Sequence, residues 1–315
     1  MTTLLYTHPA CLDHDTGEGH PECSDRLRAV IGALEAEEFA LLERRMAPRA
    51  TLDQIAAVHD RRYVEAVMEA IPAEGYVLLD GDTTASPGSG EAALRAAGAL
   101  VAAVDAVVAG EADNAFCAVR PPGHHAESDQ AMGFCLFNNV AIGAVHARQA
   151  HGLERIAVID FDVHHGNGTQ HMFERDPGLF YASTHQWPLY PGTGALEERG
   201  IGNIVNAPLP PGAGSTEFRA IMTERVLPAL DRFQPDLIMI SAGFDAHRAD
   251  PLAMLELVEA DYAWVTNALA EVARTHCRGR LVSALEGGYD LAALARSAAA
   301  HVRALMELGT NRGTA

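Results

Sequence analysis

VIDFDVHHGNGTQ, residues 158–170, is the most informative stretch of the sequence. It completes an apolar run, RIAVID at 155–160, and polar and glycine residues follow at once. Uninterrupted apolar runs are typical of strands in a parallel sheet that helices cover on both faces. Ligands bind beyond the carboxyl ends of such strands. The stretch therefore predicts a buried parallel strand with a binding site at its end.

The same pattern occurs three more times along the chain. An apolar run followed by a polar, glycine-containing turn is found in NAFCAVRPPGHHA (114–126), DLIMISAGFDAHRADP (236–251) and RLVSALEGGYD (280–290). Helical patterns lie between these runs at 91–109, 215–233 and 256–275. The alternation predicts a single α/β domain over residues 1–315, with a short flexible tail at about 308–315. Because parallel strands end at one edge of a sheet, we expect the four turns to converge on one site.

The composition excludes several classes of protein. The chain has 315 residues, with 23 Lys and Arg against 42 Asp and Glu, which gives a formal net charge of −19. We therefore expect neither direct nucleic-acid binding nor attachment to an anionic membrane, and a cationic partner is easier to accommodate. A content of 48% hydrophobic residues is enough to bury a core, which excludes disorder for most of the chain.

Features that bear on location favour the cytoplasm. The first residues, MTTLLYTHPACLDHD, lack a basic leader and an apolar segment, and the most apolar stretch, 96–110, is interrupted by Asp105 and is too short to span a bilayer. The five cysteines are scattered and form no C-x-x-C pair, so neither a disulfide framework nor an all-cysteine zinc site is expected. We predict a cytoplasmic protein with reduced thiols.

Three residues form a candidate metal site. Asp162 and His164 are two residues apart at a strand end, so both side chains point to the same side, and Asp245 follows another apolar run. Two carboxylates and one imidazole suit a divalent ion of zinc type with an open position for water. Alone, a D-x-H pattern is more often a helix cap beside a loop histidine. The stretch DFDVHHGNG, however, would bury two aspartates and two histidines, which is costly without a ligand.

Further polar residues suggest proton transfer near this metal site. His124 and His125 follow RPPG, and Asp160 is a candidate to orient one of them because it shares a strand face with Asp162. Tyr289 follows two glycines, so its phenol could donate to a developing oxyanion. Alternatively, the histidines are an incidental pair and the glycines form a turn before a helix.

Six motifs together resemble the histone deacetylase superfamily, in particular its class II-like bacterial deacetylases and acetylpolyamine amidohydrolases. The motifs span most of the chain and are HDTGEGHPECSDR (14–26), RPPGHHA (120–126), MGFCLFNNVAI (132–142), VIDFDVHHGNGTQ (158–170), SAGFDAHRADPL (241–252) and LEGGYD (285–290). The resemblance implies the fold that this family shares with arginases, an eight-stranded parallel sheet flanked by helices. Where relatives commonly read HPERP, this chain has HPECS at 20–24, which we expect near the site entrance.

The resemblance also implies roles for the residues of the candidate site. By this resemblance Asp162, His164 and Asp245 bind zinc. His125 is implied to be the general base that activates water, and Tyr289 to polarise the substrate carbonyl. The supporting residues are implied to be His124, held by Asp160, and Asn167, which groups the chain with class II.

The resemblance extends to the substrate channel and to a second cation. Gly133 and Phe134 match the segment that lines the substrate tunnel, and Tyr190 is expected to form the opposing wall. A potassium ion is implied beside the zinc, and a second monovalent site is implied near Phe173. The residues implied to hold the first potassium are Asp160, Asp162, His164, Ser183 and Thr184.

The sequence thus predicts a zinc-dependent amidohydrolase that removes an acetyl or related acyl group from an N-acylated primary amine, such as acetyl-lysine or an acetylpolyamine. The substrate is a small molecule or a peptide, and a homo-oligomer is possible. Asp80 and Asp82, in the rim loop 74–90, could hold a substrate ammonium or a peptide N–H, or form a solvated turn. A binuclear ureohydrolase would need further bridging aspartates, and a non-hydrolytic acyl-amine binder is the remaining alternative.

Overall fold

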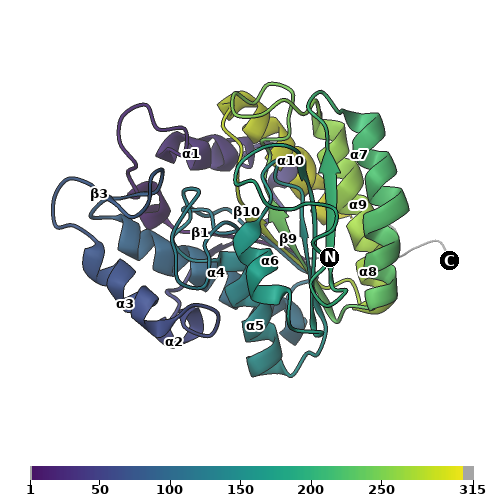
Figure 1. Cartoon of the computed structure of the whole chain (residues 1–315), viewed down its shortest axis with the longest axis horizontal. Helices are drawn as coiled ribbons and strands as arrows, with labels where there is room; N and C mark the ends of the chain where they lie inside the picture. Colours follow the sequence, from purple (N-terminus) through teal and green to yellow (C-terminus); the bar gives the residue numbers. More distant parts are fainter. Residues whose placement is uncertain (1, 308–315) are drawn as a thin grey trace.

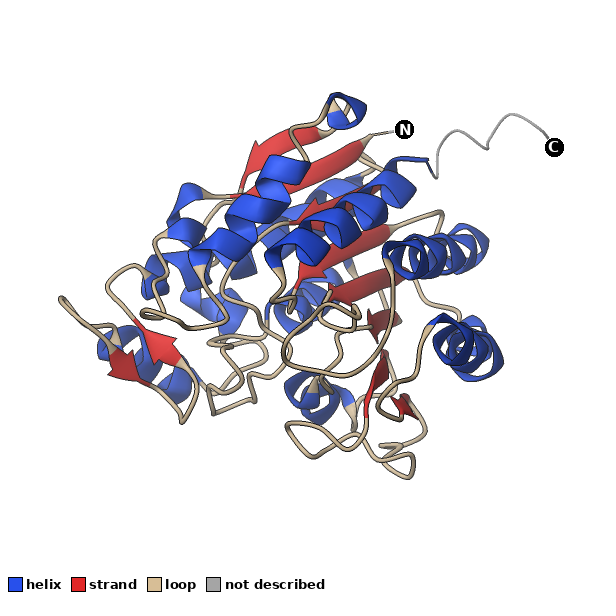
Figure 2. Cartoon of the chain, turned by 90° about the horizontal axis from the view of Figure 1, so that it is seen from above, coloured by secondary structure: helices blue, strands red, loops and turns tan. Residues whose placement is uncertain are grey.

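The computed structural model describes residues 2–307, so the predicted tail at 308–315 lies outside the described residues. Its centre is an eight-stranded sheet in the order β2-β1-β5-β10-β9-β6-β7-β8, with all neighbouring strands parallel (Figures 1 and 2). The strands are β1 Thr3–Thr7, β2 Glu43–Met46, β5 Asn114–Cys117, β6 Ile156–Asp160, β7 Leu179–Gln186, β8 Ile204–Leu209, β9 Leu237–Ala242 and β10 Leu281–Leu285. A separate antiparallel pair, β3 Val77–Leu78 and β4 Thr84–Ala85, lies in the loop 74–90. The predicted α/β fold with eight parallel strands is confirmed.

The four apolar runs of the sequence form four neighbouring strands of this sheet. In the order β5-β10-β9-β6 they occupy its middle, and every residue of these strands is buried. Burial on both faces explains why these runs do not alternate between apolar and polar residues. Edge strand β2 is largely exposed and reads ERRM, so it gave no such signal. The polar turns after the four central strands therefore begin side by side.

Helices cover the sheet in two groups (Figure 1). Helices α4 and α5 pack against each other, and α10 packs against both α1 and α9. The helices are α1 Ser24–Ala33, α2 Leu52–Ile55, α3 Arg61–Ala70, α4 Ser89–Ala109, α5 Asn139–His151, α6 Asn167–Phe173, α7 Ser215–Ile221, α8 Leu227–Phe233, α9 Glu259–His276 and α10 Leu291–Glu307.

Two helices differ from their predicted bounds for local reasons. The helix predicted over 215–233 is divided into α7 and α8 by a π-helical turn, Met222–Val226, directly before the second helix, which has Pro228 in its first turn. Proline has no N–H to bond within a helix interior, so it is favoured in a first turn. Helix α9 begins at Glu259 rather than 256 because the Asp261 carboxylate accepts the Val258 N–H at 3.0 Å and caps the helix there.

Helix α4 is longer than the apolar stretch in the sequence suggested. It has 21 residues, and its most apolar window would, by length and composition alone, be able to cross a membrane. The helix predicted over 91–109 is confirmed apart from two further residues at its start, and Asp105 lies inside it. However, 67% of that window is buried inside the protein, where the helix packs on β1, β5 and β10. Its apolar composition is accounted for by its place in the core.

One glycine of α4 tests how closely this helix approaches its neighbours, and a glycine of α1 serves as the control. A Cβ on Gly98 would lie 2.0 Å from the Pro48 carbonyl oxygen, whereas a Cβ on Gly32 in α1 would have no atom within 4 Å. We expect Gly98→Ala to lower the free energy of unfolding by about 1–3 kcal/mol through overpacking. Gly32→Ala should raise it by up to about 1 kcal/mol, since alanine is the better helix former. Urea denaturation measures both, and equal effects of the two substitutions would contradict the close approach.

Candidate active site

The turns after the central strands are held together by hydrogen bonds from one strand end to the next. The Val163 N–H, after β6, donates to Asp245 Oδ1 after β9 at 2.8 Å. The Gly287 N–H, after β10, donates to Asp162 Oδ2 at 2.8 Å. Segments far apart in sequence thus meet at one edge of the sheet, as the sequence pattern predicted.

The three predicted zinc ligands lie together at this edge. The ligand atoms of Asp162, His164 and Asp245 are all within 4.8 Å of one another, and all three residues are buried. His164 Nδ1 is 3.2 Å from Asp162 Oδ1 and 3.1 Å from Asp245 Oδ2. The backbone closes tightly around these carboxylates, because a Cβ on Gly243 would lie 2.0 Å from an Asp162 oxygen and one on Gly287 would lie 2.1 Å from an Asp245 oxygen. Only glycine fits at either position.

The electrostatics of this cluster favour a cation. Burial and the neighbouring Asp162 raise the pKa of Asp245 to about 7. Burial disfavours a charge on His164, but hydrogen bonds to Asp162 and Asp245 outweigh it and raise the pKa of the imidazole to about 10. The two carboxylates thus hold a positive charge at His164 Nδ1. A donor set of two carboxylates and one imidazole fits a divalent ion of zinc type, which can take the place of that proton.

His124 and His125 lie next to this cluster with their rings 4.0 Å apart. His124 Nδ1 is 2.9 Å from Asp160 Oδ2, and the Tyr181 hydroxyl donates to the same oxygen at 3.0 Å. Burial opposes protonation of His124, but the carboxylates of Asp162 and Asp160 outweigh it and raise its pKa to about 10. His124 is therefore positively charged at neutral pH.

His125 has the opposite character. Its Nδ1 is 2.8 Å from Asn167 Oδ1, while Asn167 Nδ2 donates to Glu127 Oε1 at 2.6 Å. Because the Glu127 carboxylate takes the amide N–H, the amide oxygen faces His125, so His125 carries its proton on Nδ1 and Nε2 is the acceptor. Burial, and next the charge of His124, lower the pKa of His125 well below its usual value. His125 is thus a neutral base at neutral pH.

These residues open onto a narrow pocket of about 210 Å³. The Phe134 and Tyr289 rings are 6.0 Å apart, and the Tyr190 ring is 5.2 Å from that of His125. Burial raises the pKa of the Tyr289 phenol, so its hydroxyl stays protonated and able to donate. The pocket is lined by Asp82, His125, Gly133, Phe134, His164, Leu189, Tyr190, Leu252 and Tyr289.

Asp82 shapes one wall of the pocket as well as lining it. Its Oδ1 accepts the Gly133 N–H at 3.0 Å and the Thr83 hydroxyl at 2.9 Å. Gly133 has a φ of 56° and lies against His125, where a Cβ would be 2.4 Å from the imidazole ring. Asp80 is in the same loop and accepts the Gly81 N–H at 2.6 Å. The loop 74–90 therefore reaches the pocket through Asp82.

The residues expected at the potassium sites lie at two separate places. Asp160 and Ser183 are partners in the register of β6 and β7, and Ser183 Oγ is 2.9 Å from His185 Nδ1. Thr184 Oγ1 is buried and has no hydrogen-bond partner among the described residues. Phe173 is buried at the end of α6 and borders a wider pocket described below.

Glu286 is a site residue that the sequence reasoning missed. Its Oε2 accepts the N–H groups of Gly123 at 2.7 Å and His124 at 3.2 Å, so it fixes the turn that carries both histidines. Burial raises its pKa to about 7. The signal was present, because Glu286 directly follows an apolar run, as Asp162 nearly does.

A buried ion-pair network beneath Tyr289 was also missed. Glu22 binds Arg120 through both carboxylate oxygens and Arg26 at 3.0 Å. The Arg26 guanidinium lies 4.9 Å from the Tyr289 ring centre and donates to the carbonyl oxygens of Glu286 and Gly288, so it supports the loop that carries the tyrosine. The segment 20–24 thus contributes Glu22 to the interior, while its His20 ring lies 4.8 Å from the ring of Phe134 on the pocket wall.

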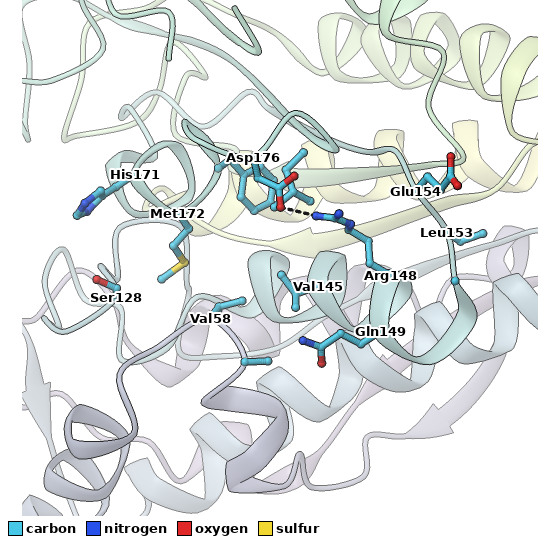
Figure 3. Close-up of a pocket in the computed structure, with 14 residues that line it drawn as sticks. Val58, Ser128, Val145, Arg148, Gln149, Leu153, Glu154, His171, Met172 and Asp176 are labelled. Atoms are coloured by element: carbon cyan, nitrogen blue, oxygen red, sulfur yellow. Dashed lines mark hydrogen bonds and ion pairs between the residues drawn. The ribbon is translucent and has the colours of Figure 1, made fainter. Parts of the chain in front are cut away.

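A wider pocket of about 960 Å³ lies between α5 and α6 (Figure 3). It contains an ion pair between Arg148 and Asp176, with His171 and Ser128 at its edge. His171 Nδ1 bonds to Glu127 Oε2, so Glu127 connects this pocket to Asn167 and His125. The pocket itself has no buried trio of carboxylate and imidazole ligands among the described residues.

Comparison with known proteins agrees with this geometry. The model of the histone deacetylase domain matches residues 20–305. Histone deacetylase 14, chloroplastic, of Arabidopsis thaliana is 43% identical over 96% of this chain and 76% of that protein. The histone deacetylase-like amidohydrolase of Pseudomonas aeruginosa is 43% identical over 86% of this chain and 73% of that protein.

A solved structure gives the same answer for the fold. The crystal structure of the HDA15 HD domain superposes with a TM-score of 0.92 and 36% identity, covering 98% of this chain and 89% of that one. The resemblance inferred from the six motifs is confirmed. The chain belongs to the histone deacetylase family of amidohydrolases.

Proposed function

We propose that this protein is a zinc-dependent deacetylase that hydrolyses the amide of an N-acetylated primary amine. The observation that carries the proposal is the buried trio Asp162, His164 and Asp245 beside a neutral and a charged histidine in one narrow pocket. The trio would hold the zinc ion, which when bound lowers the pKa of water and polarises a carbonyl.

The chain's own side chains would carry the proton transfers. His125 Nε2 takes a proton from the attacking water, because burial and the charge of His124 keep His125 neutral. The Asp160 carboxylate, 2.9 Å from His124 Nδ1, favours the charged form of His124. The Tyr289 hydroxyl donates to the developing oxyanion, and one of the two histidines then protonates the leaving amine.

The pocket favours a slim substrate. Its volume of about 210 Å³ is below the range of about 300–1,000 Å³ that is typical of drug-sized ligands. The walls formed by Phe134, Tyr190 and Leu252 suit the alkyl chain of acetyl-lysine or of an acetylpolyamine. Asp82 would meet a substrate ammonium or a peptide N–H, and the net charge of −19 would attract cationic partners, more weakly at high salt.

A potassium ion is proposed beside the zinc site, held by Asp160, Asp162 and His164 together with Ser183 and Thr184. The register of Ser183 with Asp160 supports it, and the Thr184 backbone carbonyl would supply the remaining oxygen. We also propose that the protein works in the cytoplasm, since its five cysteines are free.

A single zinc ion distinguishes the proposal from a binuclear ureohydrolase. Among the described residues, this edge of the sheet has one trio of metal ligands. Asn167, where a further bridging carboxylate would be expected, instead bonds to His125. We therefore expect one catalytic zinc per chain.

Metal removal tests the chemistry. Chelation should abolish hydrolysis of an acetyl-lysine peptide, acetylputrescine and acetylspermidine, and zinc should restore it, because the ion activates the water. Catalytic efficiencies across this panel would identify the preferred acyl-amine. Full activity of metal-free protein, or hydrolysis of none of the three by zinc-loaded protein, would contradict the proposal.

Substitution of Tyr289 tests the oxyanion role. Tyr289→Phe should reduce kcat by about 100- to 1,000-fold with little change in KM, because the lost hydroxyl would act mainly in the transition state. Tyr6→Phe is the matched control, since its hydroxyl donates to the Ala102 carbonyl oxygen on α4 and Tyr6 does not line the pocket. Near-normal turnover of zinc-loaded Tyr289→Phe would exclude the role.

The pH profile tests the role of His125. This base must be neutral to accept a proton, and its lowered pKa places the acidic limb of kcat/KM below the usual histidine value of about 6.5. Asn167→Asp puts a carboxylate beside Nδ1 and raises the pKa of His125, so activity should be lost at a higher pH than in the native protein. Gln149→Glu, an exposed amide-to-acid change on α5, should leave the limb in place. If the acidic limb of the kcat/KM profile is unshifted in Asn167→Asp, that limb reports the titration of a group other than His125.

A further inference from the structure

A second cluster of metal-ligating side chains lies outside the candidate active site, where α4 packs on α5. Asp105 comes from α4, and His146 and His151 come from α5. The Nε2 atoms of both histidines are 2.7 Å from the same oxygen, Asp105 Oδ1. The two rings are 5.7 Å apart and inclined at 84°, so they approach this oxygen from different directions.

We propose that Asp105, His146 and His151 bind a divalent transition-metal ion of zinc type, which connects α4 to α5. Two imidazole nitrogens and one carboxylate oxygen form a donor set that such ions prefer, and water can fill the remaining position. This site goes beyond the proposed deacetylase function and does not depend on it.

The packing of the two helices explains why the three side chains meet. A Cβ on Gly143 of α5 would lie 3.2 Å from the Leu100 Cβ of α4, so glycine allows a close approach there. Asp105 and His146 follow this contact by about one helical turn. Gly152 ends α5 directly after His151 with a φ of 66°. The cluster is thus built on helix positions that the fold fixes.

The exposure of the three side chains suits an ion that exchanges with solvent. The side chains of His146 and His151 are 14% and 24% exposed, whereas that of Asp105 is 50% exposed. Ligands at about 2.0–2.1 Å from a tetrahedral ion lie about 3.3 Å apart, so the 2.7 Å contacts must open by about 0.6 Å. The half-exposed Asp105 side chain can move that far without disturbing the core.

Asp105 is also unusual for its position in the sequence. It is a charged residue within the most apolar of the described helices, between the buried Val104 and Ala106.

The pair His276 and Asp231 makes the same 2.7 Å contact on the surface but is not part of a trio of ligands among the described residues. This pair is therefore a natural control for a histidine and aspartate without a third ligand.

The two metal sites differ in ligands, so they can be distinguished. The candidate catalytic centre offers one imidazole and two carboxylates, and the site between the helices offers two imidazoles and one carboxylate. Cu²⁺ bound at the second site should therefore couple to two imidazole nitrogens in its electron paramagnetic resonance spectrum.

Zinc stoichiometry of the full chain at buffered free zinc tests the proposal. Native protein and His276→Gln should bind two zinc ions per chain, whereas His146→Gln and Asp105→Asn should each bind one. Asp245→Asn should also lose one ion, but from the candidate catalytic centre, so failure of the two sites is measured separately. One ion in native protein that is lost in Asp245→Asn, or two ions in both His146→Gln and Asp105→Asn, would overturn the proposal.

A second measurement uses Asp245→Asn to observe the helix site alone. Added zinc should raise its melting temperature, because the ion binds only the folded state, and this shift should disappear when His146→Gln is added. Cu²⁺ should give the two-nitrogen spectrum in Asp245→Asn and lose it in the double variant. No melting shift together with no two-nitrogen spectrum in Asp245→Asn would contradict the site.

Discussion

Four carboxylates are buried close together where β6, β9 and β10 end: Asp160, Asp162, Asp245 and Glu286. Burial of so much negative charge is costly unless positive charge or hydrogen-bond donors accompany it. The surrounding structure supplies both. Backbone N–H groups after neighbouring strands donate to Asp162, Asp245 and Glu286, and His124 binds Asp160. Even with these donors, Asp162 and Asp245 still favour a positive charge at His164 Nδ1. A divalent cation suits this position.

The properties of the other site residues follow from this constraint. The carboxylates keep His124 charged, and that charge, together with burial, keeps His125 neutral. Glu127 orients Asn167 and so selects the proton position on His125. Arg26, paired with Glu22, supports the loop that carries Tyr289 through the Gly288 and Glu286 carbonyl oxygens. The two histidines and the tyrosine proposed to act on the substrate therefore depend on buried ion pairs that do not themselves line the pocket.

The central strands and the ligand trio could be predicted because burial on both faces leaves apolar runs, and the polar residues follow them directly. Glu286 had the same signal but was not assigned. Arg26, Glu22 and Glu127 could not be found this way, because their roles depend on contacts between distant segments, such as that of Arg26 with Gly288, 262 positions away. Helix α4 shows the same limit: its helical pattern continues through Asp105, but nothing local indicates that this carboxylate meets two histidines of α5. Which side chains meet across two different elements cannot be derived from the local sequence pattern.

The most direct test of a single catalytic zinc ion is a crystal structure of the zinc-loaded protein with anomalous diffraction measured on both sides of the zinc absorption edge. The account predicts one strong peak at ligand distance, about 2.0–2.1 Å, from Asp162, His164 and Asp245. A structure of fully loaded, active protein without a peak at these residues would contradict it. So would two peaks bridged by carboxylates at this edge of the sheet.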